Sequence, residues 1–379
     1  MVAEYQQGQR ITRLMPLADA LAAVDAQVRP VEPRETDVVK AIGRILAADA
    51  VAPEARPAAA LALRDGWAVK SEETTDAGSY TPAVLSLPPV RVETGDILPP
   101  DADAVAVMDA VVFRGKSAEA VASAAPGEGV LPKGADAEPG KPLRCVGQCL
   151  RSIDAAVLLG AGISRVSIRE PRIRVVRARG AGNVVLDACY GWVARSIEAD
   201  GGVTISDQDT EQSVHHLEAA LHHEGSDAVV ILGGTGNGSS DISVSTLAKT
   251  GRVEFHGVGL IPGETAAFGF AGARPVLLLP GRIDAALAVW LVIGRRWLGR
   301  LTARGDEQMP FMVELSGKIT STVGMAEVVP MRRENGKVEP LASGYLPFSA
   351  LARADGWVLV PAASEGFPAG AWVAVRPLA

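Results

Sequence analysis

The sequence predicts a multidomain α/β protein, and three observations lead to this fold class. The 379 residues are enough for roughly two to four domains of about 100–200 residues each. In the middle of the chain, short β-branched runs alternate with helical patterns, which is the order of βαβ units in a parallel sheet with helices on both faces. On either side of this region, prolines and glycines separate short valine-rich runs, which predicts smaller β-rich units.

The first fifty residues are expected to be helical. Apolar residues recur at helical spacing from Leu17 to Val24, after Pro16, and Pro30 lies beyond the end of this pattern. A second helix is expected from Thr36 to about Leu46, with Thr36 as its N-cap. Another helical pattern runs from Leu150 to Gly160. We therefore expect residues 1–50 and 141–168 to form one discontinuous helical linker domain.

Residues 51–140 have a different character, with frequent prolines and short strand-like runs, and are expected to form a β-rich domain. Two of its loops place charge beside glycine, at Asp65-Gly66 and at Thr94-Gly95-Asp96. Ordinary turn chemistry accounts for both loops without any function.

Residues 169–303 are expected to form the α/β domain. Its predicted strands are Arg172–Ala178, Val203–Ser206, Ala228–Leu232 and Val276–Leu279, and its predicted helices are Trp192–Ala199, Thr210–Glu224 and Asp284–Leu298. After Arg304 the apolar period returns to two, in four runs separated by glycine and proline. Residues 304–379 are therefore expected to form a small C-terminal β-barrel or sandwich.

The stretch from Asp227 to Asp241 carries the strongest functional signal. A buried-strand pattern, Ala228 to Leu232, leads into a loop with four glycines and then, after Asp241, into a segment that could open a helix. Strand, glycine loop and helix N-terminus together form an anion-binding arrangement at the carboxyl edge of an open α/β sheet. The alternative is a tight strand-to-helix turn that binds nothing, because such motifs are weak when they occur alone.

Composition limits the kinds of binding partner and the cellular location that we expect. The formal net charge of −7 argues against a general nucleic-acid or anionic-membrane partner. The three cysteines are too few for a disulfide framework and are expected to be reduced. The polar first ten residues lack the apolar core of a signal peptide, and the most apolar later run is too short to span a membrane. We expect a cytoplasmic protein.

The order of several motifs resembles the molybdopterin molybdenumtransferase family, of the MoeA and gephyrin E-domain type, over nearly the whole chain. The segment Arg64-Asp65-Gly66-Trp67-Ala68-Val69 is similar to the family's Met-Asp-Gly-Tyr-Ala-Val. Further similar segments follow in the family's order: Thr94 to Val105, Gly134 to Gly140, Gly233 to Asp241, Pro262-Gly263, Leu279-Pro280-Gly281 and Ser343 to Leu351.

The resemblance implies an elongated homodimer whose central domain is a MogA-like, three-layer α/β domain that binds molybdopterin. It implies insertion of molybdate into adenylylated molybdopterin, with Mg²⁺ and release of AMP, and a molybdoenzyme as a possible partner. The implied catalytic carboxylates are Asp65, from the neighbouring subunit, Asp136 and Asp241, and the implied metal ligands are Asp241 and Asp209. The implied cofactor contacts are Thr94, Gly180, Gly182, Gly233, Gly234, Thr235, Gly236, Gly238, Pro280, Gly281 and Arg282.

Several chemical positions depart from the family pattern. An acidic pair is replaced in Arg179-Gly180-Ala181-Gly182, an Asn appears as Cys189, and family lysines appear as Gly257, Ile261 and Glu264. Two hypotheses follow. In the first, Arg177, Arg179 and Arg282 replace the lysines, since arginine can grip an oxyanion bidentately. In the second, the chain is a non-catalytic relative that binds the cofactor or a partner enzyme.

Overall fold

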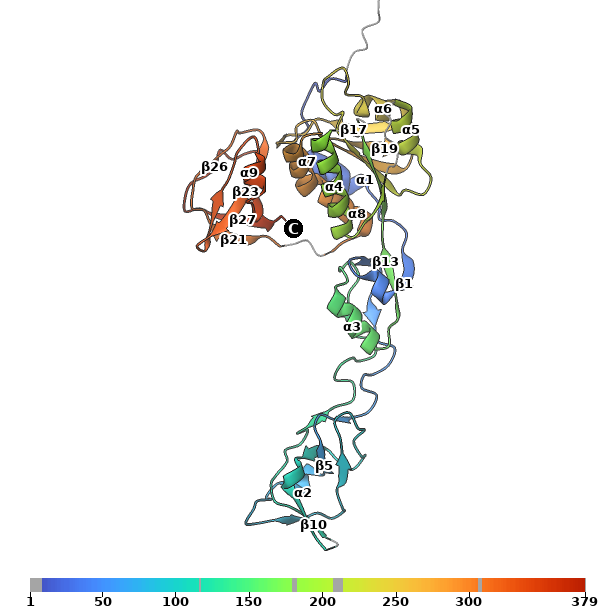
Figure 1. The fold of residues 1–379 in the computed structure, drawn as a ribbon, viewed down its shortest axis with the longest axis vertical. Coiled ribbons are helices and arrows are strands. Elements are labelled where there is room, and N and C mark those ends of the chain that lie inside the picture. The colour runs from blue at the N-terminus through green and yellow to red at the C-terminus, as the bar shows by residue number, and fades with distance from the viewer. Residues whose placement is uncertain (1–8, 116, 179–182, 207–213, 306–308, 379) are drawn as a thin grey trace, which may run out of the picture.

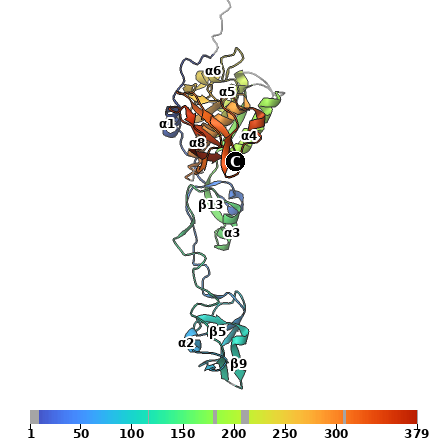
Figure 2. The same cartoon turned by 90° about the vertical axis from the view of Figure 1, so that its left-hand side faces the viewer.

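The computed structural model describes residues 9–115, 117–178, 183–206, 214–305 and 309–378. Figure 1 shows an elongated molecule, with a wide α/β region and a C-terminal sheet at one end and a small β-rich region at the other. A narrow middle region that contains one helix joins the two ends, and Figure 2 shows that the molecule is slender from the side as well.

A six-stranded sheet forms the centre of the wide end, in the order β15-β14-β16-β20-β19-β17. Its strands are β14 (Arg172–Arg177), β15 (Val203–Ser206), β16 (Ala228–Leu232), β17 (Arg252–His256), β19 (Ala267–Ala271) and β20 (Arg274–Leu279). The first four strands in this order are parallel, as the alternating pattern predicts. β17 and β19 are antiparallel. The expectation of a parallel sheet is therefore incomplete, because Gly272, with φ of 61°, turns β19 directly into β20 as a hairpin.

Helices cover both faces of this sheet. Four helices share one apolar core on one face: α1 (Leu17–Gln27), α4 (Val184–Ala199), α7 (Ile283–Val289) and α8 (Arg295–Thr302). A π-helical segment, η3 (Trp290–Gly294), joins α7 to α8. Helices α5 (Val214–His222) and α6 (Ser243–Thr250) pack against the other face. Figure 1 shows the two sets on either side of the sheet, so the domain has three layers.

The strand order reverses direction at β14. From β14 the chain crosses through α4 to β15 on one side, and β16 then pairs with β14 on the other side. At such a reversal the connections leave neighbouring parallel strands in opposite directions, and ligands of open α/β sheets bind outside the carboxyl ends of those strands. The ends of β14 and β16 are therefore the place in this fold where a ligand site is expected.

The middle region is less helical than the sequence predicts. The chain from 34 to 46 forms β1 (Arg34–Asp37), a short 3₁₀ turn η1 (Val38–Ala41) and β2 (Ile45–Leu46), so the expected helix from Thr36 to Leu46 is wrong. β1 pairs antiparallel with β13 (Arg165–Arg169), and Gly43 has a φ of 81°, which ends any helical run. The other expected helix is confirmed as α3 (Ser152–Gly160).

The β-rich end consists of short strands. One three-stranded sheet joins β5 (Gly66–Val69), β7 (Val90–Val92) and β8 (Ala104–Ala106), and another joins β6 (Ala83–Val84), β9 (Val111–Arg114) and β10 (Ser117–Ala120). Two strand pairs lie nearer the middle region, β3 (Ala50–Val51) with β12 (Pro142–Arg144) and β4 (Leu61–Ala62) with β11 (Val130–Leu131). One short helix, α2 (Ser71–Thr74), lies between β5 and β6.

The C-terminal part is a mostly antiparallel β unit, and all four strand runs expected after Arg304 are confirmed. Its strands are β21 (Phe311–Glu314), β22 (Ile319–Thr320), β23 (Ala326–Glu334), β24 (Lys337–Pro340), β25 (Gly356–Val360), β26 (Gly366–Phe367) and β27 (Trp372–Pro377), with the short helix α9 (Phe348–Leu351). β18 (Leu260–Ile261), from the α/β region, pairs with β23 and ties the two parts together.

Candidate ligand-binding site

The end of β14 and the loops after β16 and β20 meet at the carboxyl edge of the central sheet, where a methyl group on Gly234 would lie 2.9 Å from Ala178 Cβ. The loop after β14 ends at Asn183, whose side chain accepts a hydrogen bond from Leu186 N and caps α4. The loops after β16 and β20 touch, because a methyl group on Gly281 would lie 3.4 Å from the Cα of Gly233. The sequence-predicted contacts Gly233, Pro280 and Gly281 are therefore brought together by the fold.

The first two glycines of the loop are required by the turn itself. Gly233 and Gly234 have φ of 83° and 68°, which side-chain-bearing residues rarely adopt. A methyl group on Gly234 would lie 2.4 Å from Ser243 Oγ, which donates a hydrogen bond of 2.9 Å to Gly233 O. The alternative of a tight turn thus accounts for both residues without a ligand.

Asp241 closes the same loop. Its Oδ2 accepts a hydrogen bond of 3.0 Å from Gly238 N, and its own N–H donates to Gly238 O at 3.0 Å. A methyl group on Gly236 would lie 2.7 Å from Asp241 Oδ2. The carboxylate of Asp241 therefore lies against Gly236 and Gly238 and fixes the conformation of the loop.

The next residue, Thr235, carries the feature that points to a ligand. Thr235 is 2% exposed, its hydroxyl contacts Thr265 Oγ1 at 2.9 Å, and its carbonyl contacts His256 Nε2 at 2.8 Å. Within the described part of the chain, the amides of Gly234 and Thr235 have no hydrogen-bond acceptor. Both residues are buried. Buried backbone N–H groups without a partner are rare in native proteins, because each one costs the free energy of a lost hydrogen bond.

The first turn of α6 is not available to a ligand. Val244 N and Ser245 N both donate to Gln9 Oε1, at 3.0 and 3.1 Å. The part of the sequence argument that relied on the helix N-terminus is therefore wrong. Sequence reasoning missed Gln9, and nothing in its neighbourhood distinguishes it from any polar residue near a terminus.

Arg282 follows the loop after β20 and begins α7. Its guanidinium binds Asp284 through two nitrogens, with Nε 3.1 Å from Oδ1, and lies 5.3 Å from the ring centroid of Tyr345 in the C-terminal part. The hydrogen bonds that Arg282 donates to Asp284 raise the pKa of Arg282. Arg177, at the end of β14, is paired in the same way, with Nη1 2.6 Å from Asp187 Oδ1.

Arg177 and Arg282 are thus each paired with a carboxylate, which offsets the positive charge that would attract an oxyanion. Four residues of the predicted site and its replacement set lie outside the described residues: Arg179, Gly180, Gly182 and Asp209.

Three predicted site residues lie in the β-rich end. Asp65 accepts hydrogen bonds from Thr94 N at 2.8 Å and Thr94 Oγ1 at 3.1 Å, and the pKa of Asp65 is lowered, first by the backbone donor and then by the hydroxyl. Asp136 is exposed, and its N–H donates to Arg56 O. Asp65 directly precedes β5, and Figures 1 and 2 place β5 and α6 at opposite ends of the molecule. One chain therefore does not bring Asp65 and Asp241 together.

The described residues of one chain do not form a Mg²⁺ site. Across the described ranges, no three His, Cys, Asp or Glu side chains form a group that could hold a metal ion. Mg²⁺ requires several oxygen ligands in near-octahedral geometry. Asp241 alone does not supply these.

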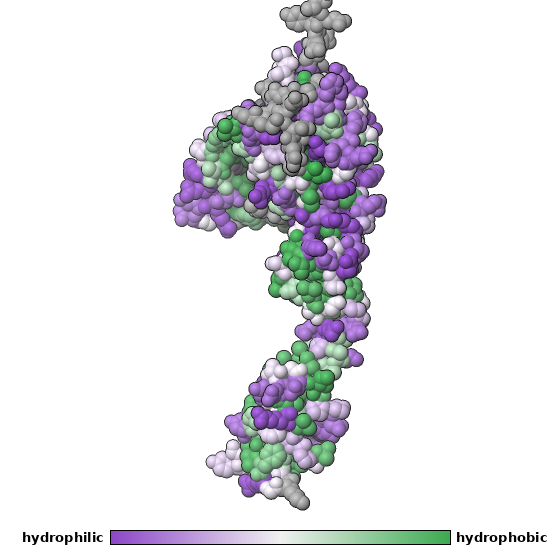
Figure 3. Space-filling model, turned by 45° about the vertical axis from the view of Figure 1, so that its right-hand side comes forward, coloured by the Kyte–Doolittle hydropathy of each residue, from purple (hydrophilic) through white to green (hydrophobic). Residues whose placement is uncertain are grey.

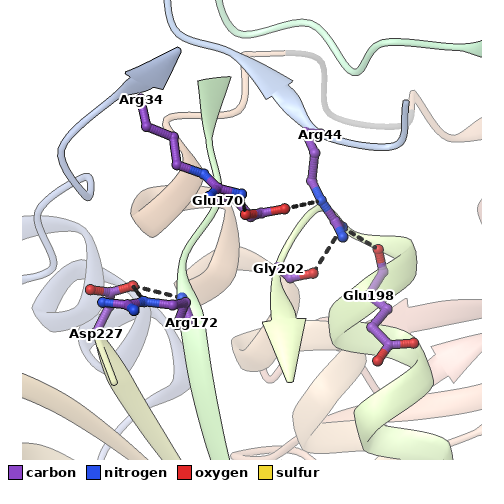
Figure 4. A network of polar contacts seen from close by, with 7 residues as sticks. All are labelled: Arg34, Arg44, Glu170, Arg172, Glu198, Gly202 and Asp227. Carbon is purple, nitrogen blue, oxygen red and sulfur yellow. Dashed lines mark hydrogen bonds and ion pairs between the residues drawn. The ribbon is translucent and has the colours of Figure 1, made fainter. Parts of the chain in front are cut away.

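The opposite, amino edge of the sheet contains a hollow of about 640 Å³. It lies where the chain crosses between the α/β region and the middle region, and Figure 4 shows the charges beside it. Glu170 binds Arg34 and Arg44, with Arg44 Nε 2.6 Å from Oε1. Arg172 N donates to Asp227 Oδ2 at 2.7 Å. Arg172 Nε also lies 3.7 Å from Asp227 Oδ2. All five of these charged side chains therefore already have a partner of opposite sign.

No helix within the described residues is long and apolar enough to cross a membrane.

Comparisons with known proteins match three consecutive parts of the chain. The MoeA N-terminal region (domain I and II) matches residues 15–162. A probable molybdopterin binding domain matches residues 182–300, and the MoeA C-terminal region (domain IV) matches residues 312–378.

Individual relatives agree with these matches. A putative molybdopterin biosynthesis protein of Methanocaldococcus jannaschii is 26% identical, over 96% of this chain and 98% of its own. Molybdopterin molybdenumtransferase 1 of Mycobacterium tuberculosis is 29% identical, over 81% of this chain and 78% of its own. The crystal structure of a molybdopterin biosynthesis MoeA protein from Pyrococcus horikosii superposes with a TM-score of 0.78 at 26% identity, covering 97% of this chain and all of that one.

Proposed function

The chain belongs to the MoeA family and thus to molybdenum cofactor biosynthesis, and within that role we propose that it inserts molybdate into adenylylated molybdopterin. Molybdopterin and molybdate are then its substrates, and AMP is released. The observation that carries this proposal is the pair of buried amides at Gly234 and Thr235, which have no acceptor within the described residues. A phosphate of the pterin is an acceptor of the required kind, because successive backbone N–H groups in a glycine-rich turn bind anions.

We propose that the site is completed by a second copy of the chain. The two ends of one molecule are too far apart to meet, so Asp65, Thr94 and Asp136 can reach the loop of Asp241 only from a partner. The middle region offers a surface for pairing, with exposed apolar side chains at Val39, Ile42, Val146, Ile153 and Val157. Figure 3 shows a continuous apolar surface at this height of the molecule. Large exposed apolar patches on soluble proteins mark interaction sites.

Mg²⁺ belongs to the proposal only if further carboxylates join Asp241. Asp65 or Asp136 of a second copy, or Asp209, would have to join Asp241 to supply the oxygen ligands. A cytoplasmic location is also kept as an expectation from composition. Neither point is needed for the phosphate contact at Gly234 and Thr235.

A mixing experiment tests the shared site. Asp65→Asn and Gly234→Ala each remove one half of it, so each variant alone should lose activity. Co-expression forms mixed dimers in which one of the two sites is intact, and about a quarter of wild-type activity should return for random pairing. Activity that stays at the level of the single variants would contradict a site built from two copies.

A second candidate function is a relative that binds molybdopterin, or a molybdoenzyme, without inserting the metal. It is favoured by one observation, the pairing of Arg177 with Asp187 and of Arg282 with Asp284, which leaves less positive charge for molybdate. Titration with molybdopterin, with and without molybdate, and rescue of a transferase-deficient strain separate the two. Rescue supports insertion, whereas binding without rescue supports the second function.

A further inference from the structure

Residues 9–15 lie across the glycine loop and are held at both ends. At one end, Met15 forms a bridge beside Val258, with Met15 N donating to Gly257 O at 3.0 Å and Gly259 N donating to Met15 O at 2.8 Å. Ile11 packs so closely on Gly257 that a methyl group there would lie 2.7 Å from Ile11 Cγ2. The segment is therefore a fixed part of the α/β region, although it precedes residue 15, where the family match begins.

At the other end, the carboxamide of Gln9 is fully used. Nε2 donates to Gly234 O at 2.6 Å and to Gly236 O at 2.9 Å, while Oε1 accepts from Val244 N and Ser245 N at 3.0 and 3.1 Å. A primary amide has two N–H donors and one oxygen with two lone pairs, so these four bonds saturate it. The pattern also fixes the orientation of the amide, because reversing it would place oxygen against two carbonyls.

The two carbonyls that Gln9 binds determine where two amides point. Gly234 O also accepts from Ser243 N at 3.1 Å, so Gln9 and Ser243 hold it together, whereas Gly236 O is held by Gln9. In a planar trans peptide, the C=O of one residue and the N–H of the next point in opposite directions. Holding Gly234 O and Gly236 O toward Gln9 therefore directs the N–H groups of Thr235 and Asn237 to the opposite side of the loop. Neither of these two amides has an acceptor within the described residues.

Gln9 also removes the competing anion site. Its oxygen occupies the first-turn amides of α6, a helix whose N-cap residue Ile242 provides no side-chain cap. Within the described residues, the loop amides of Thr235 and Asn237 remain without an acceptor, whereas Val244 N and Ser245 N have one. One side chain thus caps the helix and orients the loop.

We propose that Gln9 is a positioning residue that aims the N–H groups of Thr235 and Asn237 at the phosphate of molybdopterin. This inference rests on the proposed function for the identity of the ligand. It assigns the phosphate contact to the loop amides on the face away from Gln9, and not to the N-terminus of α6. It also gives the segment before residue 15 a role in substrate binding.

The test replaces Gln9 by Glu, which keeps the size and the acceptor oxygens but loses both donors. At pH 7.5 the new carboxylate faces Gly234 O and Gly236 O, so the loop turns away and molybdopterin binding should weaken about tenfold or more. As the pH falls toward about 5, protonation returns one O–H donor, and binding relative to wild type should recover. Gln9→Ala should lose affinity by several-fold at every pH, with no recovery.

The matched control is Gln148→Glu, which makes the same charge change in the middle region. Gln148 uses only its oxygen, which accepts from Cys145 N, and a carboxylate keeps that bond. This variant should bind molybdopterin as wild type does. Wild-type affinity in Gln9→Glu, or a loss that does not recover at low pH, would overturn the proposal.

Hydrogen exchange without ligand separates this inference from the proposed function. The amides of Val244 and Ser245 should exchange about tenfold faster or more in Gln9→Ala than in wild type, because they lose their acceptor. Equal exchange in the two proteins would refute the positioning role, whatever the ligand. A wild-type chain that shows this protection but binds no molybdopterin would refute the proposed function alone.

Discussion

The two edges of the central sheet differ in whether their polar groups have partners. The amino edge has a hollow of about 640 Å³, but its carboxylates Glu170 and Asp227 are each bound by arginine groups. The carboxyl edge is tightly packed around glycine, yet it buries amides that have no acceptor among the described residues. We base the proposed ligand site on unmet hydrogen-bonding capacity and not on open volume.

The amino edge is instead suited to holding the molecule together. Glu170 is nearly buried and receives Arg34 and Arg44, both from the middle region. Arg44 also donates to Gly202 O at 2.9 Å in the α/β region, and burial lowers its pKa. These contacts fix the α/β region to the middle region where the chain passes between them, as Figure 4 shows.

The largest effect is expected at the carboxyl edge, from Gly234→Ala. Alanine would have to adopt the left-handed backbone of Gly234, and its methyl group would displace Ser243 Oγ from Gly233 O. Together these two effects should lower the free energy of unfolding by about 2–4 kcal/mol. Because the loop must move, molybdopterin binding should fall at least tenfold. Denaturant unfolding and ligand titration measure the two effects.

The control for this variant is Gly225→Ala in the same domain. Gly225 also has a positive φ, 93°, but a methyl group there meets no atom within 4 Å. Only the backbone term should remain, about 1–2 kcal/mol, with binding unchanged. Equal effects of the two substitutions would show that close packing at Gly234 is unimportant.

At the amino edge, Arg44→Ala should separate stability from binding. It leaves the carboxylate of Glu170 with one arginine and removes the donors to Gly202 O, at an expected cost of about 2–3 kcal/mol. Affinity for molybdopterin should stay at the wild-type value. The half-exposed Arg165, paired with Asp37 at 3.3 Å, provides the comparison, and Arg165→Ala should cost under about 0.5 kcal/mol. A ligand that binds the amino edge would instead lose affinity in Arg44→Ala.

The smallest expected effect is on the pKa of Asp65, the residue that a second copy is proposed to contribute to the site at the carboxyl edge. The pKa of Asp65 is lowered first by Thr94 N and then by Thr94 Oγ1. Thr94→Val removes only the hydroxyl, so the pKa should rise toward 3.8 but remain below it, as a carboxyl carbon NMR titration would measure. A full return to 3.8 would show that the backbone donor has no influence.

The sign of the pH dependence follows from this lowered pKa. A depressed folded-state pKa means that the Asp65–Thr94 contact contributes stability above the ordinary value of 3.8 and loses it as the pH falls through the folded value. Asp65 therefore remains ionised throughout the neutral range, as a carboxylate that binds a cation must.

The architecture could be predicted where local pattern and tertiary context agree. The runs at 203–206, 228–232 and 276–279 were strong β patterns, and all three lie in strands of the central sheet. The segment 36–46 was predicted as a helix with Thr36 as its N-cap, but pairing of β1 with β13, more than a hundred residues away, overrides that preference. The hairpin of β19 and β20 was missed because its turn has a single glycine, Gly272.

The candidate site could be predicted only in part, for a related reason. The glycine loop and Asp241 are contiguous, so their pattern is visible in the sequence. Gln9 lies 225 residues before Gly234, and no periodicity links a single glutamine to a loop at that separation. Arg282 and Asp284 are two residues apart, yet the sequence does not show that their side chains pair. This pairing weakens the hypothesis that Arg282 replaces a family lysine, and it depends on side-chain geometry that spacing does not specify.

A structure of the chain with bound molybdopterin tests the central claim most directly. The account predicts the pterin phosphate at the carboxyl edge, within hydrogen-bond distance of the amides of Thr235 and Asn237, on the face of the loop away from Gln9. A phosphate bound in the amino-edge hollow beside Arg34 and Arg172, or one that displaces Gln9 from the first turn of α6, would contradict it.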